Sequence, residues 1–154
     1  MNSIKELLSY ELKICLIHAD RLKLALNKIE AMYPVNSTTV TNLREEELAY
    51  LDFFTTRLGK LQDNISKIFN LLLQYLGEPV DNCSFIDKLN KLEKLEILSD
   101  ASWWQELRQL RNILTHEYPD DPNLIAENLN IAVIQAKRLL IFWESLNSYI
   151  STKI

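Results

Sequence analysis

The stretch LDFFTTRLGKLQDNISKIFNLLLQYLGEP at residues 51–79 decides the fold that we expect. Its apolar residues recur at alternating intervals of three and four, which is the period of one face of an α-helix. They are Leu51, Phe54, Leu58, Leu61, Ile65, Ile68 and Leu72. Gly77 followed by Pro79 is a typical helix stop. The stretch therefore predicts a long helix whose continuous apolar seam must pack against other helices.

Few residues interrupt the remainder of the chain. The 154 residues include only 2 glycines and 4 prolines, which favours helices over a many-turned β fold. We place the start of the seam helix near Asn42, with Glu45 three residues later as its capping-box partner. Four further helices are expected over residues 3–33, 84–95, 99–116 and 121–149, and the polar loop 35–41 separates the first from the second.

The helix boundaries follow from local signals. Pro34 ends the first helix, because the residue before a proline resists the helical region. Ser84 with Asp87 marks the start of the third helix, Ser99 or Asp100 caps the fourth, and Asp121 before Pro122 starts the fifth. Short connections favour antiparallel neighbours. We therefore predict an all-α protein, a single domain over residues 1–154 that folds as an up-and-down antiparallel bundle of about five helices.

Composition narrows the classes of function. The formal net charge of −4 argues against a general nucleic-acid coater, because such proteins are usually basic. An RNA-binding role would need a local cationic site or a site doubled by dimerisation. The N-terminal MNSIKELLSYELK has early acids and no long apolar run, so we expect no signal peptide and no membrane span. Cys15 and Cys83 are predicted to be unpaired thiols in a reducing cytoplasm.

The segment RNILTHEY at residues 111–118 carries the candidate chemistry. Arg111 lies about 40° from Leu107 on a helical wheel, at the edge of the apolar stripe formed by Trp103, Leu107, Leu110 and Leu114. An arginine so placed normally has a partner anion or a ligand. His116 lies about 140° further round. Both side chains can meet one ligand if the helix frays at His116, or if a second copy faces the first across a two-fold axis.

These residue types suit RNA cleavage by the RNA's own 2′-hydroxyl. His116 titrates near neutrality and can accept or donate the proton, while Arg111 binds phosphate through a planar fork. Asn112 would orient the phosphate or fix the helix geometry. The two histidines form no HExxH pattern and no CxxC is present, so the residues favour chemistry without a metal or another cofactor. The structural alternative is a core-edge arginine and a histidine that stabilises a helix C-terminus.

The wider string WQELRQLRNILTHEYPDD at residues 104–121 resembles the signature of the HepT-like branch of the HEPN superfamily. That signature reads Arg-Asn, three residues, His, any residue, Tyr, on the fourth helix of a bundle. The segments RLGKLQD at 57–63 and FIDKLNKLEKL at 85–95 resemble the corresponding segments of one subgroup. The resemblance covers roughly residues 42–121 and the helix order of the whole chain.

This resemblance implies a metal-independent endoribonuclease, the toxin of a type VII-like toxin–antitoxin pair, acting as a homodimer with its active cleft at the two-fold axis. Arg111 and His116 match the catalytic pair of the family, and Asn112 matches its polar follower. Tyr118 matches the tyrosine to which a minimal nucleotidyltransferase, the antitoxin partner, transfers AMP. An AMP group two residues from His116 would bring negative charge to the place where RNA phosphate should bind.

Other residues have two interpretations. Arg108 and Thr115, on the arc beside Arg111, are candidate phosphate or RNA contacts. Arg57 is a third candidate; with Asn64 it could face the Arg111 cleft, or the two could form a solvated face or a polar pair within their helix. Asp63 lies opposite the seam and is not predicted to be catalytic.

The remaining aromatic and basic residues favour structural roles. The tryptophans Trp103, Trp104 and Trp143 are expected in the core or a dimer interface rather than under RNA bases, and His18 is expected to be structural or on the surface. The triplet Lys88, Lys91 and Lys94 is either a solvated face or a weak RNA-facing stripe. Two other functions stay open: a non-catalytic substrate-binding partner of a minimal nucleotidyltransferase, and a purely structural helical dimer.

Overall fold

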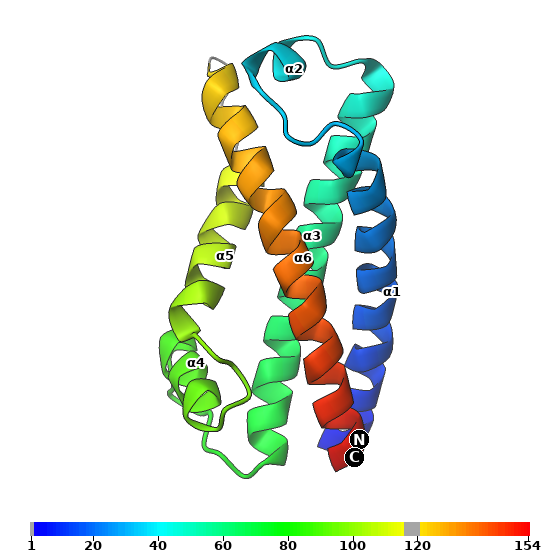
Figure 1. The fold of residues 1–154 in the computed structure, drawn as a ribbon. Helices are drawn as coiled ribbons and strands as arrows, with labels where there is room; N and C mark the ends of the chain where they lie inside the picture. Colours follow the sequence, from blue (N-terminus) through cyan, green and yellow to red (C-terminus); the bar gives the residue numbers. More distant parts are fainter. Residues whose placement is uncertain (1, 116–120) are drawn as a thin grey trace.

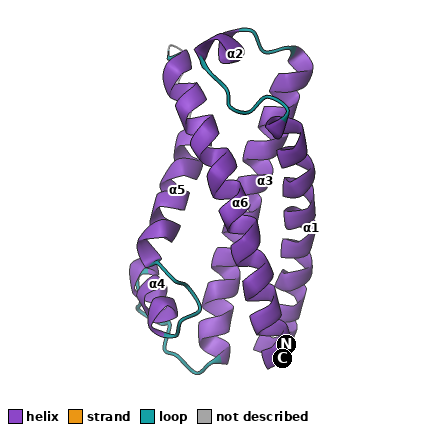
Figure 2. Cartoon of the chain, viewed as in Figure 1, coloured by secondary structure: helices purple, strands orange, loops and turns teal. Residues whose placement is uncertain are grey.

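The computed structural model describes residues 2–115 and 121–154, and within these residues the regular secondary structure is entirely helical (Figure 2). The helices are α1 (Ile4–Glu30), α2 (Ser37–Thr41), α3 (Glu45–Tyr75), α4 (Phe85–Lys94), α5 (Ala101–Thr115) and α6 (Pro122–Lys153). The prediction of an all-α helical bundle is confirmed. The described part of the chain holds six helices rather than the five expected, because the short α2 was not predicted.

Three long helices, α1, α3 and α6, run side by side along most of the bundle (Figure 1). The chain ascends through α1, descends through α3, turns through the shorter α4, ascends through α5 and descends through α6. Helix α5 packs against both α3 and α6, on the flank away from α1 (Figure 1). The two chain ends consequently lie together at one end of the bundle, and α5 leads towards the other.

The seam of α3 lies in the core, as its spacing predicted. All seven of its residues are buried: Leu51, Phe54, Leu58, Leu61, Ile65, Ile68 and Leu72. Trp103, Trp104 and Trp143 are buried too, so the preference for a structural role of the tryptophans agrees with their position. The indole N–H of Trp103 donates to Gln135 Oε1 at 2.7 Å. Each buried indole of this kind needs such a partner for its polar group.

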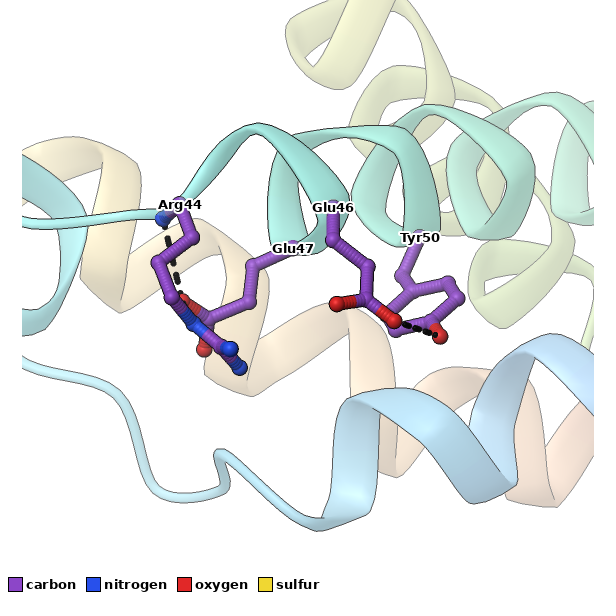
Figure 3. A network of polar contacts seen from close by, with 4 residues as sticks. All are labelled: Arg44, Glu46, Glu47 and Tyr50. Carbon is purple, nitrogen blue, oxygen red and sulfur yellow. Dashed lines mark hydrogen bonds and ion pairs between the residues drawn. The ribbon is translucent and has the colours of Figure 1, made fainter.

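The predicted start of the second helix was wrong. Asn36 and Thr39 form a capping box that begins α2 inside the expected loop, and Asn42 ends this short helix instead of starting the next. Helix α3 begins at Glu45, where the backbone N–H of Arg44 donates to Glu47 Oε1 at 3.0 Å (Figure 3). Half of a capping box therefore forms two residues later than predicted, since Glu47 rather than Glu45 supplies the carboxylate. The Arg44 side chain makes no cap hydrogen bond, because a guanidinium can only donate.

The other helix ends agree more closely with the sequence signals. Ser84 and Asp87 form the expected capping box at α4, and Asp121 Oδ1 accepts from the backbone N–H of Leu124 at 3.1 Å. Gly77 has a φ of +79° directly after the last turn of α3. Helix α1 ends at Glu30, three residues before the expected end, and α6 continues to Lys153. No helix of the described chain combines the length and apolarity that crossing a membrane requires.

Candidate functional site

Arg111 lies where α5 crosses beside α3, in the second-last turn of α5. Its Nη2 atom is 2.8 Å from Asp63 Oδ2 on α3. Its side chain also passes Gly59, where a Cβ atom would come within 3.0 Å of Arg111 Nε. The glycine allows this close approach because it has no side chain. Two residues of α3 thus determine where the arginine lies. Asp63 forms an ion pair with it, and Gly59 leaves room for its side chain.

The local sequence of α3 explains this arrangement. Gly59 and Asp63 are four residues apart, so they share one side of the helix. Ser66, on the same side, accepts a hydrogen bond from Trp104 Nε1 at 3.3 Å. This side of α3 therefore receives α5 through small or polar residues, while the adjacent apolar seam faces the core.

The ion pair between Arg111 and Asp63 orients the guanidinium more than it stabilises the fold. The side chains of Arg111 and Asp63 are 37% and 48% exposed, and pairs this exposed stabilise a fold by at most about 1 kcal/mol. The ion pair uses one nitrogen of a guanidinium that carries five N–H donors. Because the Arg111 side chain stays 37% exposed, its guanidinium can accept an anion as a second partner.

Asp63 is the residue of this site that the sequence analysis missed. Its place opposite the seam argued against a catalytic role, and its side chain is exposed. It reaches Arg111 because α5 lies beside the seam of α3 rather than over it. Two signals could have identified it: the need of Arg111 for a counter-anion, and the four-residue spacing from a glycine in mid-helix.

Three other predicted residues lie on α5 near Arg111. Arg108, Arg111 and Thr115 are spaced so that they share one side of the helix, and Asn112 lies further round. Asn112 and Thr115 are exposed, and Thr115 Oγ1 donates to the carbonyl oxygen of Asn112 at 3.0 Å. The arc of polar residues predicted along this helix is therefore present and open to ligands.

Arg57 does not lie with this group. It faces α1, where its Nη1 atom is 3.3 Å from His18 Nδ1, and its guanidinium lies over Phe53, 5.4 Å from the ring centroid. Asn64 also faces α1, because its amide nitrogen donates to Glu11 Oε2 at 2.8 Å. The suggestion that Arg57 and Asn64 face Arg111 is thus corrected: both join α3 to α1. The alternative of a pair within α3 is also incorrect.

The contact with Arg57 defines the state of His18. A guanidinium can only donate, so Nδ1 of His18 must accept and the imidazole must be neutral in this geometry. Burial lowers the pKa of His18 below its ordinary value of 6.5, and the positive charge of Arg57 lowers it further. His18 therefore has a structural role between two helices, which is one of the two roles expected for it.

His116 and Tyr118 lie outside the described residues, since α5 is described as far as Thr115. The catalytic role predicted for His116 and the AMP-acceptor role predicted for Tyr118 consequently remain predictions.

Within residues 2–115 and 121–154, no group of three or more His, Cys, Asp or Glu side chains is placed to hold a metal ion. Cys15 and Cys83 are both unpaired thiols, and burial raises the pKa of Cys15 above its usual range.

Comparison of the chain with protein-family models, with curated proteins and with solved structures found no match. The likeness to HepT-like proteins therefore rests on the motif of residues 111–118 and the two shorter segments. The geometry adds an arginine of that motif held at a partly open surface between two helices.

Proposed function

We propose that this chain is a metal-independent endoribonuclease of the HepT-like HEPN type, the toxin of a type VII-like toxin–antitoxin pair in the cytoplasm. The observation that carries the proposal is the setting of Arg111. Its guanidinium is fixed by Asp63 through one nitrogen, packs over Gly59 and keeps 37% of its side chain exposed. A fixed cation with donors to spare suits the phosphate of an RNA backbone.

In the proposed reaction, Arg111 binds the non-bridging oxygens of the scissile phosphate. His116 removes the proton from the adjacent 2′-hydroxyl, whose oxygen attacks phosphorus. The bond from phosphorus to the 5′-oxygen breaks, and that oxygen takes up a proton. The products are a 2′,3′-cyclic phosphate and a 5′-hydroxyl end. Arg111 stabilises the extra negative charge that develops on the phosphorane, and Asn112 orients the phosphate.

A homodimer completes the proposed site. A second copy across a two-fold axis would bring a second Arg111 and a second His116 to one cleft. One histidine could then accept the proton while the other donates one. Dimerisation would also concentrate positive charge locally in a chain whose formal net charge is −4. Transfer of AMP to Tyr118 by a minimal nucleotidyltransferase would silence the enzyme, because the added phosphate would compete for Arg111.

The decisive experiment is RNA cleavage by the purified protein in excess chelator. The wild type should cleave and leave 2′,3′-cyclic phosphate ends, while His116→Ala should lose a factor of about 100 or more in rate. Arg111→Lys keeps the charge but loses the planar fork, so it should lose most activity as well. Circular dichroism establishes that the variants remain folded. Cleavage by His116→Ala at the wild-type rate would refute the proposal.

The Asp63 contact favours a second candidate, because an arginine that already has a carboxylate partner can be purely structural. On this alternative, the bundle is a non-catalytic, substrate-binding partner of a minimal nucleotidyltransferase. It predicts no cleavage by wild-type protein in any buffer, but AMP on Tyr118 after co-expression with the nucleotidyltransferase. Intact-mass and peptide mass spectrometry would detect that modification.

A further inference from the structure

Arg108 is stacked on an aromatic ring from the neighbouring helix. Its guanidinium carbon lies 4.3 Å from the centroid of the Phe85 ring. Phe85 is the first residue of α4 and directly follows Ser84, whose capping box with Asp87 fixes the start of that helix. The ring therefore has a defined position and holds one side of the guanidinium, while Arg108 as a whole remains exposed.

Arg108 differs from Arg111 in having no anionic partner among residues 2–115 and 121–154. The ion pairs formed among the described residues involve Arg44, Arg111, Lys23 and Lys137, and not Arg108. Its charge is thus uncompensated within this part of the chain, and its orientation comes from the Phe85 ring. A planar cation that is ordered before any ligand arrives loses little conformational freedom on binding.

Arg108 also lies close enough to Arg111 for both side chains to contact the same nucleotide. The two residues are three positions apart on α5, so their Cβ atoms are separated by about 5–6 Å. That separation is comparable to the size of one nucleotide. A phosphate bound at Arg111 would leave a neighbouring base within reach of the Arg108 guanidinium, and guanidinium planes stack readily on the faces of bases.

We infer that the Arg108–Phe85 stack is a platform for a nucleobase of single-stranded RNA, next to the phosphate bound at Arg111. This inference rests on the proposed function and names the substrate class of that site. Single strands are favoured over duplexes because an unpaired base can turn its face towards the guanidinium, whereas the bases of a duplex are already stacked on each other.

The chain offers a matched control for this stack. Arg138 of α6 lies over Trp103 with the same separation, 4.3 Å from guanidinium carbon to ring centroid, and is likewise exposed. Trp103 precedes Arg111 by eight residues, which is about 12 Å along the helix. An effect specific to RNA bound at Arg111 should therefore respond to Arg108 and not to Arg138.

The test measures binding of a fluorescent 2′-O-methyl RNA of mixed sequence, which cannot be cleaved because its 2′-oxygens are blocked. Arg108→Lys keeps the positive charge but loses the planar stack. It should weaken binding of the single strand about tenfold, with an unchanged slope of log affinity against log salt. Phe85→Leu should act in the same direction. Arg138→Lys should bind as the wild type does, and binding of the annealed duplex should be insensitive to Arg108→Lys.

Wild-type affinity of Arg108→Lys for the single strand would overturn the inference. An equal loss on single strand and duplex would also overturn it, because Arg108 would then be an ordinary phosphate contact. Cleavage of unmodified RNA is assayed separately. If the wild type cleaves RNA while Arg108→Lys binds the single strand with wild-type affinity, the base platform is refuted and the proposed nuclease activity is supported. If the wild type does not cleave RNA but Arg108→Lys loses affinity for the single strand and not for the duplex, the proposed nuclease activity is refuted and the base platform is supported.

Discussion

The Nε atom of Arg111 lies 3.0 Å from the point that a Cβ atom on Gly59 would occupy. The arginine of the candidate site therefore depends on the absence of a single methyl group on the opposite helix. Gly59 is buried in the middle of the 31-residue helix α3, where a glycine normally weakens the helix. Its presence is explained by the space that it leaves for Arg111.

Replacing Gly59 with alanine should separate stability from activity. The substitution improves helix propensity by about 1 kcal/mol, while the new Cβ pushes the flexible Arg111 side chain aside. We expect the free energy of unfolding, measured in urea, to change by less than about 1 kcal/mol. RNA cleavage should fall tenfold or more, because small misplacements of a positioned group reduce rates strongly.

Gly77→Ala is the matched control and should show the opposite pattern. Gly77 has a φ of +79° and open space around its Cα, so alanine would be strained there and should destabilise by about 1 kcal/mol without altering cleavage. If Gly59→Ala leaves the cleavage rate unchanged, Arg111 does not need its present position.

Asp63→Asn should test whether the ion pair positions Arg111 or blocks it. The amide keeps the shape of the carboxylate but loses its charge, and the exposed pair contributes at most about 1 kcal/mol to stability. If Asp63 positions the guanidinium, cleavage should fall several-fold while the melting temperature barely moves. A higher cleavage rate in Asp63→Asn would show instead that Asp63 competes with the RNA phosphate.

Gln62 is buried to 1% exposure, and neither polar atom of its amide has a hydrogen-bond partner among the described residues. An unsatisfied buried polar group costs about 1–3 kcal/mol. We therefore expect Gln62→Leu, which has a similar volume and no polar atoms, to raise the free energy of unfolding by about 1 kcal/mol or more. Urea denaturation measures this change directly.

Asn64→Leu serves as the control for that substitution. Asn64 is also buried, at 8% exposure, but it donates to Glu11 Oε2 at 2.8 Å. Its replacement should destabilise, since it removes one partner of a charge-assisted hydrogen bond. A Gln62→Leu protein that is less stable than the wild type would mean that the amide has a role in the fold.

His18 should make stability depend on pH. Its pKa is lowered in the folded protein by burial and by Arg57, so the unfolded chain binds the proton more readily. Stability should therefore be complete above the ordinary pKa of 6.5 and decrease as the pH falls towards the folded-state pKa. Arg57→Met should raise the pKa of His18 and reduce this dependence.

NMR titration of the imidazole C–H signals would measure that change. The chain has two histidines, and His116→Ala assigns the remaining signal to His18. A pKa of His18 that is the same in Arg57→Met and in the wild type would contradict the role assigned to Arg57.

The fold was predictable where short-range physics determines the outcome. The seam of α3 could be recognised from spacing alone, because burial must follow the helical period. The caps at Ser84 and Asp121 were equally accessible, since a side chain bonds to a backbone N–H only three residues away. At Asn42 the same logic failed because Asn36 and Thr39 formed a competing capping box.

The contacts between helices were less accessible. A helical wheel placed Arg111 at the edge of an apolar stripe, but it could not tell which neighbour lies against that edge. The pairing with Asp63 and the turn of Arg57 towards His18 depend on how α1, α3 and α5 are arranged around each other. The same holds for Asn130, whose amide makes two hydrogen bonds to the backbone of Val35, 95 residues away.

The start of α1 and the end of α6 lie next to each other, at the end of the bundle remote from the start of α6 (Figure 1). Helix α6 has 32 residues and thus spans about 48 Å between that end of the bundle and the opposite one. A fluorophore or affinity handle fused to either terminus would therefore lie at the same end of the bundle. A brief peptide could also join the two termini head to tail, so the molecule is suited to circular permutation, with new ends opened in a surface turn such as that at Gly77.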